Sequence, residues 1–215
     1  MKRGVSFLLL SVLVFFGLAL EAVVGFGVEP PLYGRAMDEW SIVQMILHWL
    51  ITSFLWGMVS FLLLRYSLKK WGLDLLNQRE RLSKSQWIFA LVALAICIVV
   101  GFWDWQGFKP AIELAHNGGV KFIFQYVYYV FETVLVLLMV AFGQEAGESI
   151  FSKTGKIPWG GIVTAILWGL PHILTKGSIS AGIVAVDALL FGVIYLFTRK
   201  NTYVSYLLIF LGFVI

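Results

Sequence analysis

The stretch "FETVLVLLMVAFGQEAGESIF" occupies residues 131–151 and decides how the chain is interpreted. It completes an apolar segment of about 120–143, which is long enough for a membrane-spanning helix because about 20 apolar residues cross the hydrocarbon core. Gln144, Glu145 and Glu148 follow this segment directly. The question raised by the sequence is whether these polar groups at the end of a membrane span form a functional site.

The composition of the whole chain agrees with a membrane protein. Of its 215 residues, 60% are hydrophobic and only 13% are charged, and the mean hydropathy is +0.89. A soluble domain carries about 25% charged residues. Short segments of alternating residues, typical of a transmembrane barrel, are missing. The sequence therefore predicts an all-α, polytopic transmembrane helix bundle.

Seven hydrophobic segments follow one another along the chain, at about 5–24, 41–65, 87–105, 120–143, 159–175, 180–197 and 203–215. The last three are short, so they require tilt or protein neighbours to cross a membrane. We expect one integral membrane domain over 1–215, with three spans in 1–119 and four in 120–215. The first segment also fits a signal peptide, but its cleavage sites near "LALEAVVG" are poor.

The basic residues gather on one side of this predicted topology. Cytoplasmic loops of membrane proteins are enriched in lysine and arginine, which predicts a cytoplasmic N-terminus. The net charge of +4 then reflects these loops and does not indicate a nucleic-acid partner; membrane lipid is the expected partner. The opposite loops hold Arg35, Lys109 and Lys176, whereas the expected cytoplasmic side holds Lys2, Arg3, Arg65, Lys69, Lys70, Arg79, Arg81, Lys84, Lys153, Lys156, Arg199 and Lys200.

Cysteine and histidine usage gives no sign of a metal site. Cys97 is the only cysteine, so the chain has no internal disulfide, no CxxC motif and no Cys/His cluster. The HExxH spacing of zinc peptidases is also missing. We expect no bound metal, and the sequence indicates no particular cofactor.

Four ionisable residues lie inside predicted spans, where each costs about 2–3 kcal/mol to insert and needs a reason. For His48, a hydrogen bond from a neutral imidazole to a neighbouring helix is favoured over a site role. Glu132 either closes the floor of a polar cavity or makes a structural hydrogen bond. Asp187 is expected to be protonated or paired. His172 follows Pro171, where the helix should be kinked, and Gly169 allows another helix to approach.

The acidic cluster after residue 143 has two interpretations. On a continuing helix Gln144 and Glu148 share a face, and Glu145 and Glu148 are also neighbours. Two carboxylates this close resist ionising together, so one can serve as a general base. The alternative is a solvated helix end. Acidic residues are unfavourable there, so the helix continues to about Lys153, or Lys153 and Lys156 pair with the carboxylates.

Helix geometry suggests that the cluster meets His172. Counted from the turn at 154–158, Glu145 lies about 15 Å deep and His172 about 21–25 Å deep. Tilt or kinking absorbs a mismatch of this size. We therefore expect Glu145 and His172 to face each other inside the membrane around water that enters from the cytoplasm.

The order of these motifs resembles the CPBP family of intramembrane proteins, also called Abi or CAAX-protease-like proteins, over roughly residues 120–215. The family pattern is EExxxR on one span, FxxxH on the next and HxxxN or HxxxD near the end. Here "QEAGES" (144–149) stands at EExxxR, and "WGLPH" (168–172) stands at FxxxH with Trp168 replacing Phe. The last segment, "TYVSYLLIFLGFVI", has no histidine.

The resemblance implies an intramembrane endopeptidase of a bacterial cytoplasmic membrane that cleaves a membrane-embedded or lipidated peptide. Its water would be activated by Glu145 and His172, with Glu148 beside them. The substrate-binding residues would be Gln144, Asp187, Glu132 and Trp168. The amide of Gln144 cannot act as a base, and the terminal oxyanion pair is missing. Two alternatives follow: a catalytically silent homologue that binds peptides, or a small transporter that uses Glu132, Asp187 and His172.

Overall fold

The computed structural model describes residues 2–151, 155, 157–175 and 177–215, and these residues form helices joined by short turns, with no strand among them. The all-α prediction is confirmed. Within the described residues, five helical stretches are long and apolar enough to cross a membrane: Lys2–Tyr33, Ile42–Trp71, Lys84–Asp104, Lys109–Phe151 and Ser180–Phe197. Two further apolar helical stretches, Trp159–Thr175 and Thr202–Val214, are shorter. All seven expected segments are thus helical, but only five reach spanning length.

The distribution of side chains also fits a lipid environment. Phe54 and Val99 are 71% and 69% exposed, although they lie in the middle of long apolar helices. The hydroxyl groups of Ser11 and Thr52, in contrast, belong to fully buried residues. Lipid removes the hydrophobic penalty on exposed apolar groups, and helices in membranes use small polar residues where they meet.

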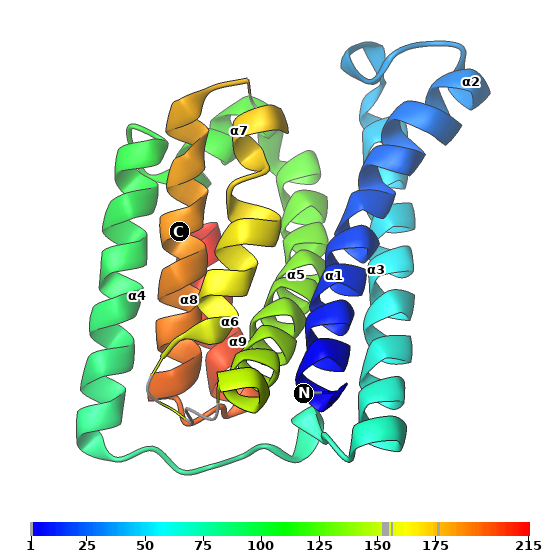
Figure 1. Ribbon diagram of the computed structural model, residues 1–215. Helices are drawn as coiled ribbons and strands as arrows, with labels where there is room; N and C mark the ends of the chain where they lie inside the picture. The colour runs from blue at the N-terminus through cyan, green and yellow to red at the C-terminus, as the bar shows by residue number, and fades with distance from the viewer. Residues whose placement is uncertain (1, 152–154, 156, 176) are drawn as a thin grey trace.

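The helices run alternately up and down between two ends of the bundle (Figure 1). Helix α1 (Lys2–Ala22) continues through a π-helix (Val23–Val28) into α2 (Glu29–Tyr33), and α3 (Ile42–Trp71) returns beside it. The segment that joins α3 to α4 (Lys84–Asp104) passes under the lower end of the bundle. We call this lower end, where the N-terminus lies, the basic end.

Local signals in the sequence fix where α3 and α4 begin. Ser41 and Gln44 form a reciprocal capping box at the start of α3, and Ser83 and Gln86 form another at the start of α4. Each box satisfies backbone N–H groups that have no partner inside the helix. Gly72 ends α3 with a left-handed φ of 65°, which a residue without a side chain adopts most easily.

Helix α5 (Lys109–Phe151) forms the centre of the bundle. It is broken near its upper end at Gly118, where φ is 68° and ψ is 166°. Below Thr133 every residue from Leu135 to Gln144 is buried. Helix α1 packs along α5, and the Ser11 hydroxyl donates a hydrogen bond to the backbone oxygen of Met139 over 3.3 Å. This half of α5 is therefore covered on all sides.

Glycines bring α6 (Trp159–Thr164) close to its two neighbours. A side chain at Gly160 would overlap the backbone oxygen of Val140 in α5, and a side chain at Gly192 in α8 (Val184–Phe197) would overlap the backbone of Gly161. Small residues allow such backbone contact between membrane helices. The expected approach at Gly169 is also present, because its neighbour is the backbone of Ala185 in α8.

Above α6 the chain leaves regular helix, as Pro171 predicts. A π-helical turn (Ala165–Gly169) leads into the short helix α7 (His172–Thr175). A 3-10 turn (Ile179–Ile183) then enters α8, and α9 (Thr202–Val214) follows after a tight turn at the basic end. The broken helices of the bundle thus lie at the upper end, and the contacts of Gly160 and Gly192 lie nearer the basic end.

Candidate functional site: a closed acid network and an open cavity

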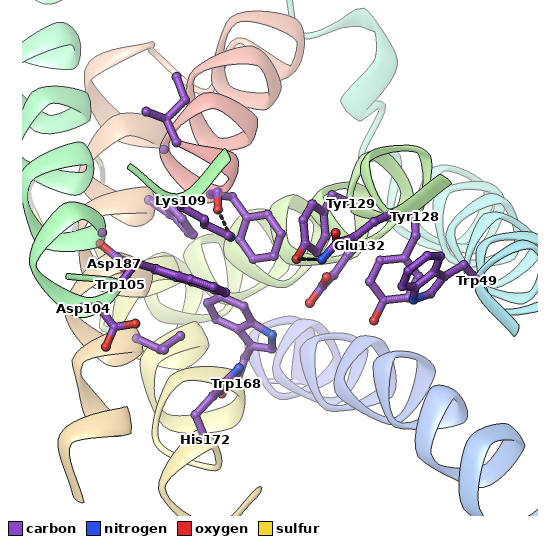
Figure 2. A pocket seen from close by; sticks show the side chains of 17 residues that line it. Trp49, Asp104, Trp105, Lys109, Tyr128, Tyr129, Glu132, Trp168, His172 and Asp187 are labelled. Carbon is purple, nitrogen blue, oxygen red and sulfur yellow. Dashed lines mark hydrogen bonds between the residues drawn. The ribbon is translucent and has the colours of Figure 1, made fainter. Parts of the chain in front are cut away.

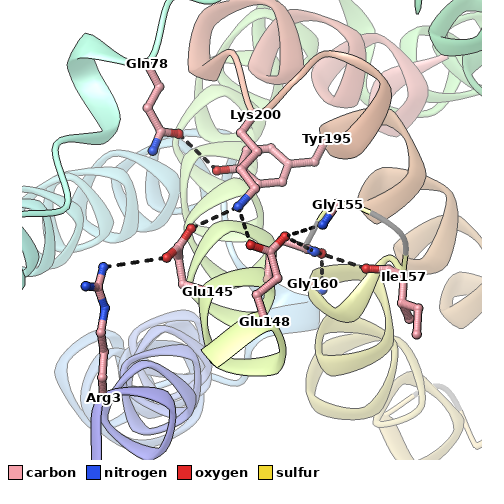
Figure 3. Close-up of polar contacts among 10 residues, drawn as sticks. Arg3, Gln78, Glu145, Glu148, Gly155, Ile157, Gly160, Tyr195 and Lys200 are labelled. Atoms are coloured by element: carbon pink, nitrogen blue, oxygen red, sulfur yellow. Dashed lines mark hydrogen bonds and ion pairs between the residues drawn. The ribbon is translucent and has the colours of Figure 1, made fainter. Parts of the chain in front are cut away.

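The polar groups at 144–148 form a closed network at the basic end (Figure 3). The Gln144 amide donates to the Glu148 carboxylate over 2.7 Å and to the backbone oxygen of Ile157 over 3.0 Å. Its own oxygen accepts from the backbone N–H of Gly160 over 3.0 Å. Glu148 also accepts from the backbone N–H of Gly155. Gln144 therefore ties α5 to the start of α6.

Lys200 neutralises this network from the turn between α8 and α9. Its ammonium lies 3.0 Å from Glu145 and 2.8 Å from Glu148, and Arg3 lies 3.8 Å from the other oxygen of Glu145. Burial lowers the pKa of Lys200, but the hydrogen bond to Glu148 and the charge of Glu145 raise it more, so the pKa lies above the ordinary lysine value. The ammonium is charged at neutral pH.

The turn that presents Lys200 is conformationally unfavourable. Arg199 and Lys200 have φ values of 56° and 62°, in the left-handed region that costs a non-glycine residue about 1–2 kcal/mol. The ion pairs with Glu145 and Glu148 offset that cost. Lys153 and Lys156, one of the two expected explanations for the carboxylates, lie outside the described residues.

The other group of predicted site residues lines an open cavity in the upper half of the bundle (Figure 2). This cavity has a volume of about 330 Å³, and we call it cavity A. Its carboxylates are Asp104, Glu132 and Asp187, and its rings include Trp49, Trp105, Tyr128, Tyr129, Trp168 and Phe213. His172 lines it as well. Helices α3, α4, α5, α8 and α9 contribute to the walls, with the π-helical turn before α7.

A second cavity of about 370 Å³, cavity B, lies against the first. Glu132, Trp168 and His172 line both cavities. The imidazole Nδ1 of His172 is 2.7 Å from the backbone oxygen of Trp168, and the two rings meet edge to face with their centroids 5.0 Å apart. These contacts fix the imidazole in the wall between the cavities.

Two carboxyl groups of cavity A differ from those of the closed network in their hydrogen bonding. Among the residues that the structure describes, none donates a hydrogen bond to the Glu132 carboxyl group, which projects into the cavity. The Oδ1 atom of Asp187 is buried and has no hydrogen-bond partner within the described part of the chain. The interpretation of Glu132 as the floor of a polar cavity agrees with this geometry.

Lys109 is the cation of cavity A, and aromatic rings surround it. Its ammonium donates to the backbone oxygen of Phe213 over 2.7 Å. It also lies 4.7 Å from the ring centroid of Phe213, 4.9 Å from that of Tyr129 and 5.4 Å from that of Trp105. Such distances are those of cation–π contacts. The aromatic wall of the cavity thus already stabilises one positive charge.

The structure separates the acidic cluster from His172. Gln144 of α5 contacts Gly160 of α6. Toward the upper end, Glu132 lies 12 residues before Gln144 and His172 lies 12 residues after Gly160. This register pairs His172 with Glu132, and Glu145 lies about 20 Å away along α5. Glu145 and His172 therefore remain at different depths in the bundle and do not line the shared cavity that we expected. Their catalytic roles stay predictions.

His48 belongs to a third polar cluster at the upper end. Its Nδ1 is hydrogen-bonded to Glu29, and both residues are about 1% exposed. Tyr33 donates to the same carboxylate over 3.4 Å, and Glu21 lies 3.8 Å from the imidazole. The expected hydrogen bond to a neighbouring helix is therefore present. Glu29 lies beyond the first apolar segment, so the hydrophobic pattern does not single it out as an intramembrane acid.

Among the described residues, no group of three or more histidine, cysteine, aspartate or glutamate residues could hold a metal ion. No family model, characterised protein or solved structure matches this chain. Any function must therefore be inferred from the polar groups of the closed network and the cavities themselves.

Proposed function

We propose that this membrane protein binds a small organic cation in cavity A and exchanges it for protons held by the cavity carboxyl groups. The observation that carries the proposal is the Glu132 carboxyl group. It projects into the cavity and receives no hydrogen bond from the described residues. A carboxyl group in the interior of a membrane protein is protonated or paired by default. A cation that enters the cavity supplies the missing partner.

The charges and rings of cavity A favour a cation over an anion. Three acidic residues, Asp104, Glu132 and Asp187, face one basic residue, Lys109. Aromatic faces attract substituted ammonium groups, and the same rings already surround the Lys109 ammonium. This combination of acids and rings matches the chemistry of an organic amine.

Exchange across the membrane is the transporter alternative of the sequence analysis. Neither cavity is lined by any α5 residue beyond Glu132, and residues 135–144 of that helix are buried. Both cavities therefore lie toward the upper end of the bundle, and we propose that the ligand enters from that end. Transport would require a second conformation in which the helices move apart in the half of the bundle nearer the basic end.

The expected orientation of the chain indicates which side of the membrane each end of the bundle faces. The basic end carries Arg3, Lys200 and the segment between α3 and α4, so we propose that it faces the cytoplasm. Cavity A then opens away from the cytoplasm. We further propose that the two shorter helical stretches cross with tilt, for seven spans in a bacterial cytoplasmic membrane.

The proposal is tested by titrating tetramethylammonium into purified protein in lipid nanodiscs. Saturable binding is expected for the wild type, and Glu132→Gln should weaken it by at least about tenfold because a charge partner is lost. Glu39→Gln is the matched control, since it removes the same charge from an exposed loop position at the upper end. Equal binding by wild type and Glu132→Gln would contradict the proposal.

A second candidate function is the CPBP-like peptidase, and one observation favours it. Glu132 and His172 line both cavities, and this shared lining supports the candidate because a hydrolytic water requires an acid–base group and an imidazole on the same cavity wall. Glu145 and Glu148 are less suitable bases because Lys200 engages both. Cleavage of a membrane-peptide library that is lost in Glu132→Gln and His172→Ala, but kept in Glu145→Gln, would support this candidate. Peptide binding without cleavage would support the silent homologue.

A further inference from the structure

Cavity B differs from cavity A in its lining. Most of its wall is apolar and comes from α1, the π-helix that follows it and α3, with Phe15, Leu18 and Trp56 among its side chains. Its polar groups are Glu21 at one side and Glu132 and His172 in the wall shared with cavity A. The two cavities together therefore offer a polar, acidic compartment next to an apolar one.

The rim of cavity B is exposed and its interior is buried. Ala22, Phe26 and Thr175 at the rim are exposed, whereas Trp56 and Trp168 inside are 1% and 7% exposed. Helix α1 rises about 30 Å from Lys2 to Ala22, which is the thickness of the hydrocarbon core. The rim therefore lies near the membrane boundary at the upper end, between α1 and α7, where an amphiphile would concentrate.

The size of cavity B sets the scale of what it accepts. An engineered apolar cavity of about 150 Å³ holds one benzene molecule. Cavity B, at about 370 Å³, has room for an apolar group larger than a single ring. A water-filled space of this size against Phe15, Leu18 and Trp56 would be unfavourable, so an apolar occupant is favoured.

We propose that the ligand is an amphiphilic cation, with its ammonium group at Glu132 and its apolar chain in cavity B. This inference depends on the proposed function for the position of the charged group. Charge complementarity supports a cation here as well, because Glu21 and Glu132 line cavity B and none of the described residues that line it is lysine or arginine. Because Glu132 lies in the wall shared by the two cavities, the ammonium group of the ligand would join its apolar chain at this residue.

The test compares two probes, tetramethylammonium and octyltrimethylammonium, on the full chain in nanodiscs of neutral phosphatidylcholine. Ala22→Trp fills the rim of cavity B from an exposed position, so the variant should fold. It is expected to weaken octyltrimethylammonium binding by at least about tenfold while changing tetramethylammonium binding by less than about twofold. Partitioning of the probe into lipid cancels, because wild type and variant are compared in the same bilayer.

Leu13→Trp is the control, because this position on α1 is 52% exposed and does not line cavity B. It should change neither affinity. Ala19→Leu adds bulk inside cavity B and should act in the same direction as Ala22→Trp.

If neither cavity B variant weakens octyltrimethylammonium binding while tetramethylammonium still binds in a Glu132-dependent way, the chain does not occupy cavity B, and only the further inference fails. If Glu132→Gln leaves the binding of both probes unchanged, the proposed function fails.

Discussion

Two acidic regions of one helix, α5, behave in opposite ways. Near the basic end, Glu145 and Glu148 share Lys200, and Glu148 accepts two further hydrogen bonds from Gln144 and Gly155. About 20 Å higher, Glu132 borders two cavities and receives no hydrogen bond from the described residues. Both regions place carboxyl groups where desolvation is costly. We interpret the partners around each carboxyl group, more than the residue type, as the difference between a structural role and the functional role proposed for Glu132.

The packing of the two regions differs in the same way. Around the closed network, glycines bring α5, α6 and α8 into backbone contact. Around the cavities, the helices are interrupted by the π-helical turn at Ala165–Gly169 and by the break at Gly118. Irregular backbone at membrane depth occurs where it is buried in protein or lines a cavity. We interpret the lower region as the scaffold and the upper region as the site.

The largest effect is expected from Gly192→Ala in the scaffold. Its new methyl group would overlap the backbone of Gly161, and backbone cannot move aside as a side chain can. We expect a loss of about 3 kcal/mol or more in the free energy of unfolding, or no folded protein at all. The measurements are the monodisperse yield in detergent and the midpoint of thermal unfolding.

The matched control for this prediction is Gly101→Ala in α4. Its nearest neighbour would be 4.0 Å away, so the substitution adds helix propensity without a clash and should be neutral or slightly stabilising. A Gly192→Ala variant as stable as Gly101→Ala would show that α6 and α8 are farther apart than described here.

The next largest effect is expected from Lys200→Met. Removing one partner of a buried ion pair costs about 3–5 kcal/mol because the remaining charges are uncompensated, and we expect the lower part of this range because Lys200 is 24% exposed. Glu132→Gln, in contrast, should change the thermal midpoint little, since no hydrogen bond from the described residues is lost. The comparison of these two variants by thermal unfolding tests whether only the lower acids are structural.

A rescue variant sharpens the same comparison. Adding Glu145→Gln and Glu148→Gln to Lys200→Met removes the uncompensated charges and should restore most of the lost stability. If the triple variant is no more stable than Lys200→Met alone, the network stabilises the fold through its geometry and not through charge compensation.

Much of this fold follows from the sequence, for identifiable reasons. Long apolar runs and the Ser41 and Ser83 capping signals are local features, so the expected ranges are largely helical, although α5 extends well beyond its expected range of about 120–143 at both ends. Pro171 and Gly169 likewise predict a broken helix and a close approach. The intramembrane polar residues, including Glu132, can also be recognised from the sequence, because an ionisable group inside an apolar span is costly in free energy.

The pairing of these residues was not visible, because it depends on contacts between distant segments. Lys200 is separated by 52 residues from Glu148, and nothing in a turn sequence specifies which helix end it meets. The depth of His172 depends on the register of α5 against α6, which is set by the contact between Gln144 and Gly160. A shift of one or two helical turns decides whether His172 meets Glu145 or Glu132, and residue counting does not resolve that shift.

The smallest expected effect is a dependence on pH that separates the two regions. A proton and a cation compete for the Glu132 carboxyl group, so tetramethylammonium affinity should rise with pH, by at most about tenfold per pH unit for each proton displaced, in titrations measured from about pH 6 to about pH 9. Glu132→Gln should flatten this rise. Lys200 should contribute no such change, because its pKa is raised above the ordinary value of about 10.4 by Glu148 and Glu145. A raised pKa gives stability that is fully present below the ordinary lysine pKa and is lost only as pH rises through the folded-state value. Calorimetric titrations of the wild type across this range, with Glu39→Gln as the control, measure the effect, and a pH-independent affinity would show that no proton is exchanged at Glu132.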